Sequence, residues 1–269
     1  LFGFDDGTRA LPANVAADTR LFRGVFTPEQ LQEFGRSFDV NYELEPVASM
    51  RPEQSYSIAG GNTWGKLGLV GAITFSNAPQ ANYEERNFLT TSGGRPILFN
   101  TYPTYNAFTE AARLGGVLNV AYRLNPTNKL IFRNTLTRDT DMESRVMTGY
   151  YDNIGDTIEA TRLRWVERGL YSVSAEGDHV VPRLANSVFH WQLTVSNSSR
   201  NEPDLRETIR QLEGPGRSRH LPLPESGLRF FNQLDDRIYE PQADWSKPFY
   251  KGPLTGVFKV GFRGTFRQR

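Results

Sequence analysis

The sequence predicts an all-β protein with antiparallel strands. Apolar and polar side chains alternate over several stretches, as they do on strands with one apolar and one polar face. Connections of only a few residues join these stretches in pairs, which is typical of β-hairpins. Long polar segments separate one pair from the next. These observations predict about seven strands, arranged as three hairpins and a final single strand.

A short helix and the first hairpin are expected in the N-terminal part of the chain. Thr27 can cap a helix, Pro28 suits its first turn, and Gln30 completes a capping box. Alternation then runs over residues 54–77, with a tight turn at Gly65 and Lys66. Residues 78–110 are polar and rich in turn-forming residues, so we expect a long loop there.

The second hairpin, residues 118–137, shows the clearest alternation. Asn125 and Asn128 bound its turn. One face is expected to carry Leu118, Val120, Tyr122, Leu124, Leu130, Phe132 and Leu136. The other is expected to carry Asn119, Ala121, Arg123, Ile131, Arg133 and Thr135. This hairpin therefore has one apolar face and one polar face.

The third hairpin is expected over residues 161–199, with a short link at residues 182–186. A long loop, residues 138–160, precedes it, and another, residues 200–253, follows it. In the final strand, residues 256–269, Phe258, Val260 and Phe262 alternate with basic residues and glycine.

Alternation alone does not decide which face is in contact with water. A soluble sandwich would bury the apolar faces between two sheets, whereas a membrane barrel would turn them towards lipid. Loops longer than about 12–15 residues are uncommon in compact soluble domains. Bacterial membrane barrels combine short periplasmic turns with longer extracellular loops. The lengths of the connections therefore favour a barrel.

Aromatic residues give a second reason to favour a barrel. Membrane barrels carry aromatic girdles where their strands cross the two membrane interfaces. We expect the following side chains near strand ends: Trp64, Tyr122, Trp165, Tyr171, Phe189 and Trp191.

Composition excludes several classes of function. The formal net charge is +1, from 31 basic and 30 acidic residues, so charge gives no reason to expect a nucleic-acid partner. The chain has no cysteine, and therefore no disulfide, no thiolate metal site and no cysteine nucleophile. Its longest apolar stretch is far shorter than the roughly 20 residues of a transmembrane helix.

Residues that could carry chemistry do not form a recognisable set. His179, His190 and His220 lack metal-ligand spacing, and His190 is expected on the polar face. Asp139, Asp141 and Glu143 lack the glycine and distal glutamate of an EF-hand loop. Asp235 and Asp236 are ambiguous, and Asp5, Asp6 and Gly7 fit a turn. We therefore expect no catalysis, no metal and no cofactor.

In a receptor, ligand contacts are expected on the long outer loops and on the lumen wall. The basic and aromatic candidates there are Arg95, Tyr102, Tyr105, Arg217, Arg219, His220 and Trp245. No binding site follows from these residues alone, because each is also compatible with a solvated loop.

Several stretches resemble the barrel region of TonB-dependent outer-membrane receptors. They are FGFDDGTRALP near the start, GRSFDVNYELEP at residues 35–46, LNVAYRLNPTNKLIFRNTLTR, and TRLRWVERGLYSVSAEGDHVV. The resemblance is distributed over most of the chain. It implies an internal segment, residues 1–269, of a 22-stranded barrel, with the plug domain and the C-terminal strands outside this segment.

The resemblance also implies a function. Such receptors, located in the bacterial outer membrane, take up a large or scarce solute such as a siderophore, cobalamin or a glycan. TonB supplies the energy and acts through the plug. The partners would be outer-membrane lipid, an extracellular ligand and the TonB complex. The alternatives are a soluble, secreted all-β binding domain, such as a carbohydrate-binding sandwich, and an extracellular β-rich hydrolase, for which no catalytic set is visible.

Overall fold

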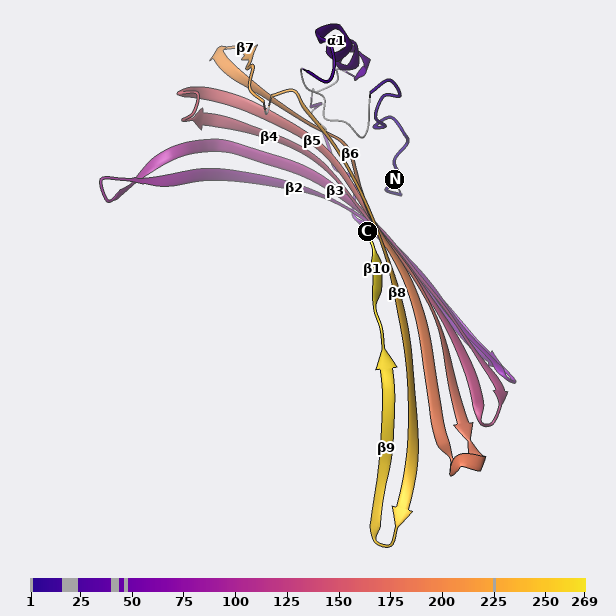
Figure 1. Ribbon diagram of the computed structural model, residues 1–269. Coiled ribbons are helices and arrows are strands. Elements are labelled where there is room, and N and C mark those ends of the chain that lie inside the picture. The colour runs from indigo at the N-terminus through magenta and orange to yellow at the C-terminus, as the bar shows by residue number, and fades with distance from the viewer. Residues whose placement is uncertain (1, 16–23, 40–43, 46–47, 225) are drawn as a thin grey trace.

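The computed structural model describes residues 2–15, 24–39, 44–45, 48–224 and 226–269 (Figure 1). The resembling stretch GRSFDVNYELEP falls partly outside the described residues. The described strands form one antiparallel sheet, which confirms the all-β prediction. The elements are α1 (Pro28–Ser37), β1 (Gln54–Trp64), β2 (Leu67–Ser92), β3 (Arg95–Asn125), β4 (Asn128–Tyr151), β5 (Asp156–Val181), the 3-10 helix η1 (Pro182–Leu184), β6 (Ser187–Gly214), β7 (Arg217–His220), β8 (Leu228–Lys251), β9 (Leu254–Arg263) and β10 (Phe266–Gln268).

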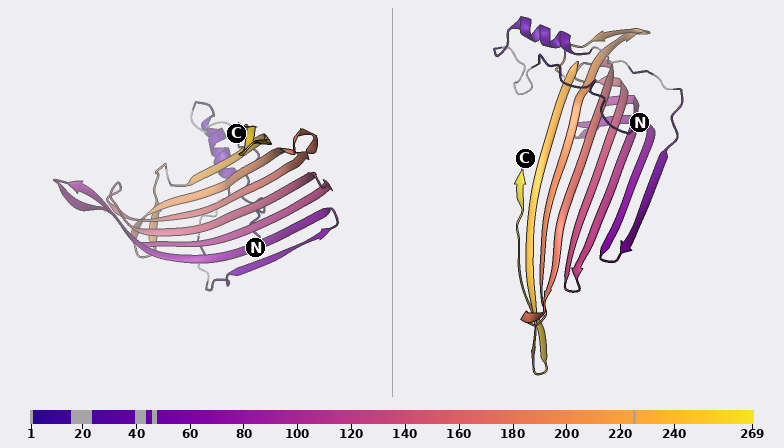
Figure 2. Two further views of the ribbon diagram at one scale, coloured as in Figure 1. Left: turned by 90° about the horizontal axis from the view of Figure 1, so that it is seen from below. Right: turned by 90° about the vertical axis from the view of Figure 1, so that its right-hand side faces the viewer.

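The sheet is a single, strongly twisted layer that does not close on itself (Figures 1 and 2). Its order is β1-β2-β3-β4-β5-β6-β8, followed by β9 and β10, which both pair with β8. The short β7 pairs with the outer part of β6. The helix α1 lies beyond one end of the strands, near the connection between β6 and β7.

The short connections lie where the sequence predicts them. Gly65 and Lys66 join β1 to β2, and Gly65 adopts φ +57°, which glycine tolerates best. The Lys66 ammonium donates a hydrogen bond to the Leu124 carbonyl at 2.9 Å, which ties this turn to β3. The turn after Asn125 and the link at residues 182–186 are also confirmed. These turns lie together at one end of the sheet, called here the turn end.

The predictions of long loops and of seven strands were wrong. Residues 78–110, 138–160 and most of residues 200–253 continue the strands, so β2 to β6 and β8 are each 24–31 residues long. The strand predicted to be single is β9, and it pairs with β8. The sequence did not predict the strands β7, β8 and β10. These extensions are mostly polar, and their apolar side chains, such as those of the neighbouring Ile97 and Leu98, point to both faces, so they show no two-residue hydrophobic period.

The helix has the capping box that the sequence predicts. The Gln30 amide N–H donates to the Thr27 hydroxyl at 3.3 Å, and the Thr27 amide N–H donates to the Gln30 side chain at 2.9 Å. Both bonds satisfy groups that the first turn of a helix leaves unpaired.

The strand register separates an apolar face from a polar face. Val120 lies opposite Phe132, and Asn119 lies opposite Arg133, so the two predicted faces of this hairpin are confirmed. On the apolar face, apolar side chains are concentrated in the half of each strand nearest the turn end, and only scattered ones, such as Phe108 and Trp165, lie beyond it. This apolar band consists mainly of Tyr56, Ile58, Trp64, Leu67, Leu69, Ile73, Phe75, Leu114, Leu118, Val120, Tyr122, Leu130, Phe132, Leu136, Tyr171, Val173, Phe189, Trp191, Leu193, Val195, Tyr239, Trp245, Phe258, Val260 and Phe262.

The apolar band is open to its surroundings. Ile58 is 73% exposed, Leu118 48% and Phe262 59%. All the described strands belong to one sheet, so none of them forms a second layer over the band. Trp165 and Tyr171 do not lie at strand ends, as expected from the sequence, but in the middle of β5. Tyr171 is the last residue of the band on β5, and Trp165 lies beyond it, past Gly169 and Glu167.

The turns are displaced progressively along the sheet. One row of paired residues runs from Leu67 through Tyr122, Leu130, Gly177, Trp191 and Ala243 to Phe262. This row begins at Leu67, the first residue of β2. It crosses β8 at Ala243, eight residues before Lys251, and β9 at Phe262, eight residues after Leu254. The strands are therefore inclined relative to the line of turns.

Candidate functional site

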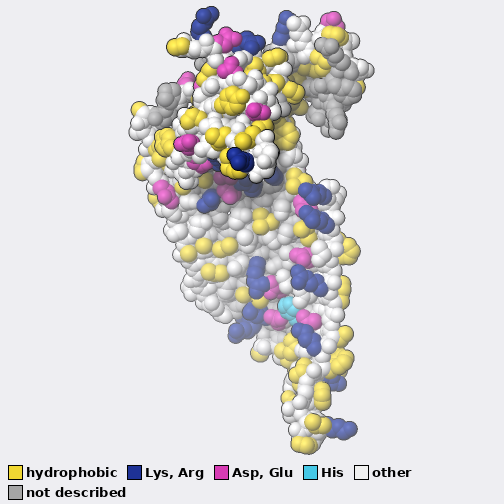
Figure 3. Space-filling model, turned by 90° about the vertical axis from the view of Figure 1, so that its left-hand side faces the viewer, with side chains coloured by type: hydrophobic (Ala, Val, Ile, Leu, Met, Phe, Trp, Pro, Cys, Tyr) yellow, Lys and Arg dark blue, Asp and Glu magenta, His cyan; other side chains and the backbone are white. Residues whose placement is uncertain are grey.

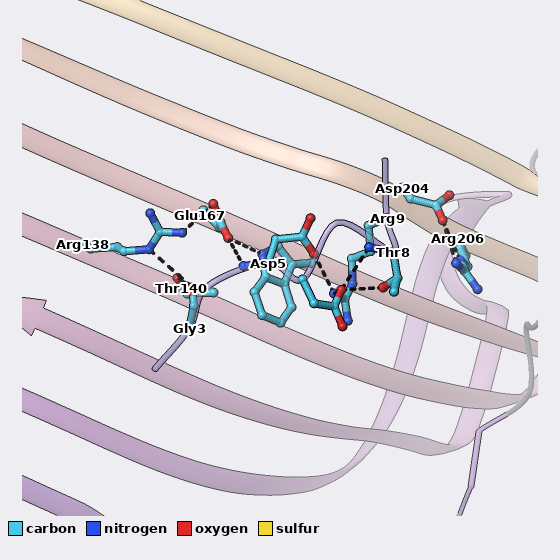
Figure 4. Close-up of polar contacts among 11 residues, drawn as sticks. Gly3, Asp5, Thr8, Arg9, Arg138, Thr140, Glu167, Asp204 and Arg206 are labelled. Atoms are coloured by element: carbon cyan, nitrogen blue, oxygen red, sulfur yellow. Dashed lines mark hydrogen bonds and ion pairs between the residues drawn. The ribbon is translucent and has the colours of Figure 1, made fainter. Parts of the chain in front are cut away.

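Residues 2–9, called here the strap, cross the apolar face just beyond the apolar band, because their partners Phe75, Thr140 and Glu167 point to that face. Figure 4 shows the polar contacts of the strap with the strands below it. The Gly3 carbonyl accepts hydrogen bonds from the Thr140 hydroxyl at 2.7 Å and from Arg138 Nε at 3.4 Å. The Asp5 amide N–H donates to Glu167 Oε1 at 2.9 Å. Glu167 also pairs with Arg138 at 2.8 Å, so one carboxylate holds both the strap and the strand beside it.

Aromatic rings and guanidinium groups also take part in the contact between the strap and the sheet. The Arg138 guanidinium lies 4.1 Å from the Phe4 ring centroid, and that of Arg9 lies 4.3 Å from the Trp165 ring. Phe2 packs on Phe75, with 5.2 Å between ring centroids. Cation–π and aromatic contacts of this kind stabilise by about 0.5–2 kcal/mol each.

The strap ends with a turn that the sequence predicts. Asp6 Oδ1 accepts hydrogen bonds from the Thr8 amide at 3.0 Å and from the Thr8 hydroxyl at 2.6 Å, and Gly7 adopts φ +84°. The hydrogen bonds from Thr8 hold the pKa of Asp6 below its ordinary value. The turn chemistry expected for Asp5, Asp6 and Gly7 is thus confirmed.

Gly3→Ala should detach the strap, whereas Gly7→Ala should not. Both glycines have positive φ, so both substitutions carry backbone strain. A Cβ on Gly3 would also lie 2.9 Å from the Cβ atoms of Ala112 and Thr140, but a Cβ on Gly7 meets nothing within 4 Å. Hydrogen exchange of the Asp5 amide should rise strongly in Gly3→Ala alone. Equal protection in the two variants would contradict this packing.

A buried ion cluster lies beyond the strap, where β6 bulges. Pro203 and Asp204 face only one residue of β8, because Glu202 pairs with Asn232 and Leu205 with Phe230. Asp204 adopts φ +53°, and its carboxylate pairs with Arg206 at 2.8 Å and with Arg229 at 2.6 Å. Arg206 also reaches Asp39, at 3.4 Å, close to the end of α1. The sequence reading missed this cluster, although a proline inside a strand is a signal for a bulge.

The polar face is covered by ion pairs between neighbouring strands. Figure 3 shows basic and acidic side chains lying next to one another along the strands. Arg168 pairs with Asp141 at 2.6 Å, and Lys259 pairs with Asp244 at 2.9 Å. Arg133 also pairs with Glu176. Since most of these charges are balanced by a neighbour, the face is polar without being strongly charged.

Glu202 is the most enclosed acid of this network. Burial alone would raise its pKa, but hydrogen bonds from Arg164 at 2.6 Å and Arg200 at 2.7 Å outweigh that effect and hold the pKa below its ordinary value. A carboxylate with a lowered pKa stabilises the fold above its unfolded pKa, and this contribution is lost as the pH falls through the folded value.

Glu202→Gln should therefore remove part of the acid sensitivity. We expect the wild type to lose stability as the pH falls below the ordinary pKa of glutamate, because Glu202 takes up a proton and releases Arg164 and Arg200. The variant should be less stable near neutrality and show a flatter pH dependence in denaturant unfolding. Parallel curves for the two proteins would show that Glu202 does not contribute.

The remaining candidates do not meet at one place. Tyr102 and Tyr105 are buried residues of β3 and form a small outer core with Ile158, Ala160, Ile209 and Leu221. Burial is the main cause that raises the pKa of Tyr102, and the neighbouring hydroxyl groups of Tyr151 and Tyr105 raise it further. Arg95 is an exposed residue at the start of β3, and Arg217, Arg219 and His220 form the exposed β7. Trp245 lies on β8 and packs edge-on against Phe258.

The histidines have structural partners. Trp191 Nε1 donates to His179 Nε2 at 3.0 Å, and His179 Nδ1 lies 2.6 Å from Asn128 Oδ1. His190 lies on the polar face, as expected, with Nδ1 2.7 Å from Asp178. His220 lies within 3.4 Å of the Ser226 hydroxyl. These contacts connect turns and neighbouring strands.

The acidic candidates are likewise paired. Asp139 approaches Arg113 at 3.5 Å, and Glu143 pairs with Arg145 at 2.8 Å. Asp236 pairs with Arg267, whose hydrogen bonds lower the pKa of that carboxyl, and Asp235 is exposed. Among the described residues, no group of three or more His, Cys, Asp or Glu side chains is placed to hold a metal ion.

The fold and these contacts define a class of architecture: a single-layer antiparallel sheet with one partly apolar and one polar face. No protein-family model and no curated protein matches the chain. In the described parts of the chain, no helix combines the length and the apolar character needed to cross a membrane.

Proposed function

We propose that the chain forms part of the wall of an outer-membrane β-barrel of the TonB-dependent receptor class, and that it serves solute uptake and not catalysis. The apolar band carries this proposal. Its apolar side chains lie on one face, in the half of the strands nearest the turns, and many of them are exposed, although the strands continue far beyond the band. Such a band fits a membrane barrel, whose outer surface is apolar over a height of about 25 Å.

The size of the band supports the same reading. In β2 it extends from Leu67 to Phe75, which is nine residues. Nine residues at about 3.3 Å each cover roughly 30 Å along the strand, and transmembrane strands have about 9–11 residues. The outer halves of the strands would then stand above the membrane, where polar side chains on both faces are solvated.

The displacement of the turns supports an inclined arrangement. If the turns share one plane at the periplasmic surface, the offset of eight residues between the β1–β2 and β8–β9 hairpins measures the tilt. About 26 Å of offset over six strand spacings of about 4.8 Å corresponds to a tilt of roughly 40°. Strands of outer-membrane barrels are tilted by about 35–45°.

The soluble sandwich is the weaker alternative. A sandwich needs a second sheet about 10 Å from the first, packed on its apolar face. The described strands all lie in one layer, and many apolar side chains of the band are more than one-third exposed. A barrel needs no second layer, because lipid covers its outer surface.

In the complete receptor, further strands would pair with the exposed edges of β1 and β9 and close the barrel. The polar face would line the lumen, an extracellular ligand would bind from the outer side, and TonB would act through the plug region. The lipid partner would be the bacterial outer membrane.

Cell fractionation tests the proposal. The complete protein should sediment with the outer membrane, resist extraction by high salt and alkaline carbonate, and require detergent for solubility. Electrostatic attachment to a membrane would be reversed by salt. A protein fully soluble without detergent would refute the proposal and support the secreted binding domain.

A further inference from the structure

We infer that the strap is an interfacial anchor, which holds Phe2 and Phe4 at the boundary between the acyl chains and the headgroups on the outer side of the membrane. This inference rests on the proposed function, since it requires the apolar band to face lipid. The strap would set how deeply this part of the wall sits in the bilayer.

The position of the strap provides the first argument. Phe2 contacts Phe75, which is the outermost apolar residue of the band on β2. Gly3 is bonded to Arg138 and Thr140, which follow Leu136, the outermost apolar residue of the band on β4. The strap therefore lies on the line where hydrocarbon contact would end and polar contact would begin.

The chemistry of the strap provides the second argument. Phe2 and Phe4 are each 57% exposed, although the backbone between them is firmly bonded to the sheet. Arg138 covers one side of the Phe4 ring, and Arg9 covers Trp165. Aromatic rings with charged groups beside them are suited to the membrane interface, where the ring meets the apolar side and the charge stays hydrated.

The fixed geometry provides the third argument. A flexible segment would gain little from two exposed phenylalanines, because ordering them at a surface costs entropy. Here the contact of Gly3 with Ala112 and Thr140 leaves no room for a side chain, and Glu167 holds the Asp5 amide. The two rings are thus presented at a constant height beside Phe75 and the exposed Tyr56.

Spin labels can measure this height directly, because residues 1–269 contain no cysteine, and any cysteine elsewhere in the complete protein can first be replaced by serine. Three single variants of the complete protein would carry a nitroxide: Phe4→Cys on the strap, Leu118→Cys in the band, and Leu98→Cys on the outer hairpin of β2 and β3. All three native side chains are exposed, so labelling should not disturb a core. The proteins would be placed in phosphatidylethanolamine–phosphatidylglycerol vesicles, with oxygen or a water-soluble nickel chelate present on both sides.

We expect the ratio of oxygen to nickel accessibility to be highest at Leu118, lowest at Leu98 and intermediate at Phe4, with several-fold steps between them. If Leu118 is in hydrocarbon but Phe4 matches Leu98, the strap is in water; the anchor is then refuted and the barrel stands. A Phe4 label as deep as Leu118, or one shielded from both reagents by protein, also refutes the anchor. If Leu118 itself is as accessible to nickel as Leu98, the proposed function fails.

Discussion

Val120→Arg should strongly impair assembly of the protein in the membrane, whereas Ala121→Arg should be tolerated. Val120 lies in the apolar band, in a row with Leu69 and Phe132. A lipid-facing arginine near the middle of a barrel wall costs about 2–4 kcal/mol. Ala121 lies on the polar face, where an added guanidinium stays hydrated. Heat-modifiable migration and protease resistance of the complete protein would report the folded fraction.

The two positions are a matched pair, since they are neighbours on one strand and point to opposite faces of the sheet. Val120→Asp and Ala121→Asp should show the same order with the opposite charge, which separates the effect of burial in lipid from that of local ion pairing. Equal tolerance at both positions would contradict the orientation of the sheet.

Asp204→Asn should destabilise the outer half of the sheet by about 3 kcal/mol, because removing one partner of a buried ion cluster leaves the other charges uncompensated. The side chains of Asp204, Arg206 and Arg229 are only 4%, 12% and 8% exposed. Asparagine tolerates the left-handed backbone of this bulge, so the substitution tests mainly the charge. Hydrogen exchange around the bulge and the midpoint of urea unfolding should both report the change.

Asp235→Asn is the control for this experiment. Asp235 is exposed, and its hydrogen bond from Gln233 is 3.2 Å long. A surface change of this kind should alter stability by less than about 0.5 kcal/mol. If Asp204→Asn behaved like this control, the ion cluster would not stabilise the bulge.

Features encoded by neighbouring residues could be predicted from the sequence. The capping box of α1 needs only Thr27 and Gln30, and the turns at Gly65 and after Asn125 need only local backbone preferences. The two faces of the second hairpin also follow from alternation, because side chains of a strand point to opposite sides in turn.

The extent of the strands could not be predicted in this way. Beyond Phe75, β2 continues for many residues whose side chains are polar on both faces, and a local reading cannot distinguish such a strand from a loop. Pairing with β3 on one side keeps β2 extended. The backbone hydrogen bonds of this pairing cannot be predicted from the residue types. The ligand candidates placed on loops, such as Tyr102 and Tyr105, therefore lie within a strand.

The sequence by itself determined the all-β class, the short turns, the helix cap and the division of each hairpin into two faces, because these depend on residues close together in the chain. Only the tertiary structure decided where the apolar band ends, how Asp204 meets Arg229, and that the strap lies across Arg138, Thr140 and Glu167. The Gly3 and Thr140 contact joins residues 137 positions apart. Such contacts depend on strand pairing across the whole sheet, which local patterns do not specify.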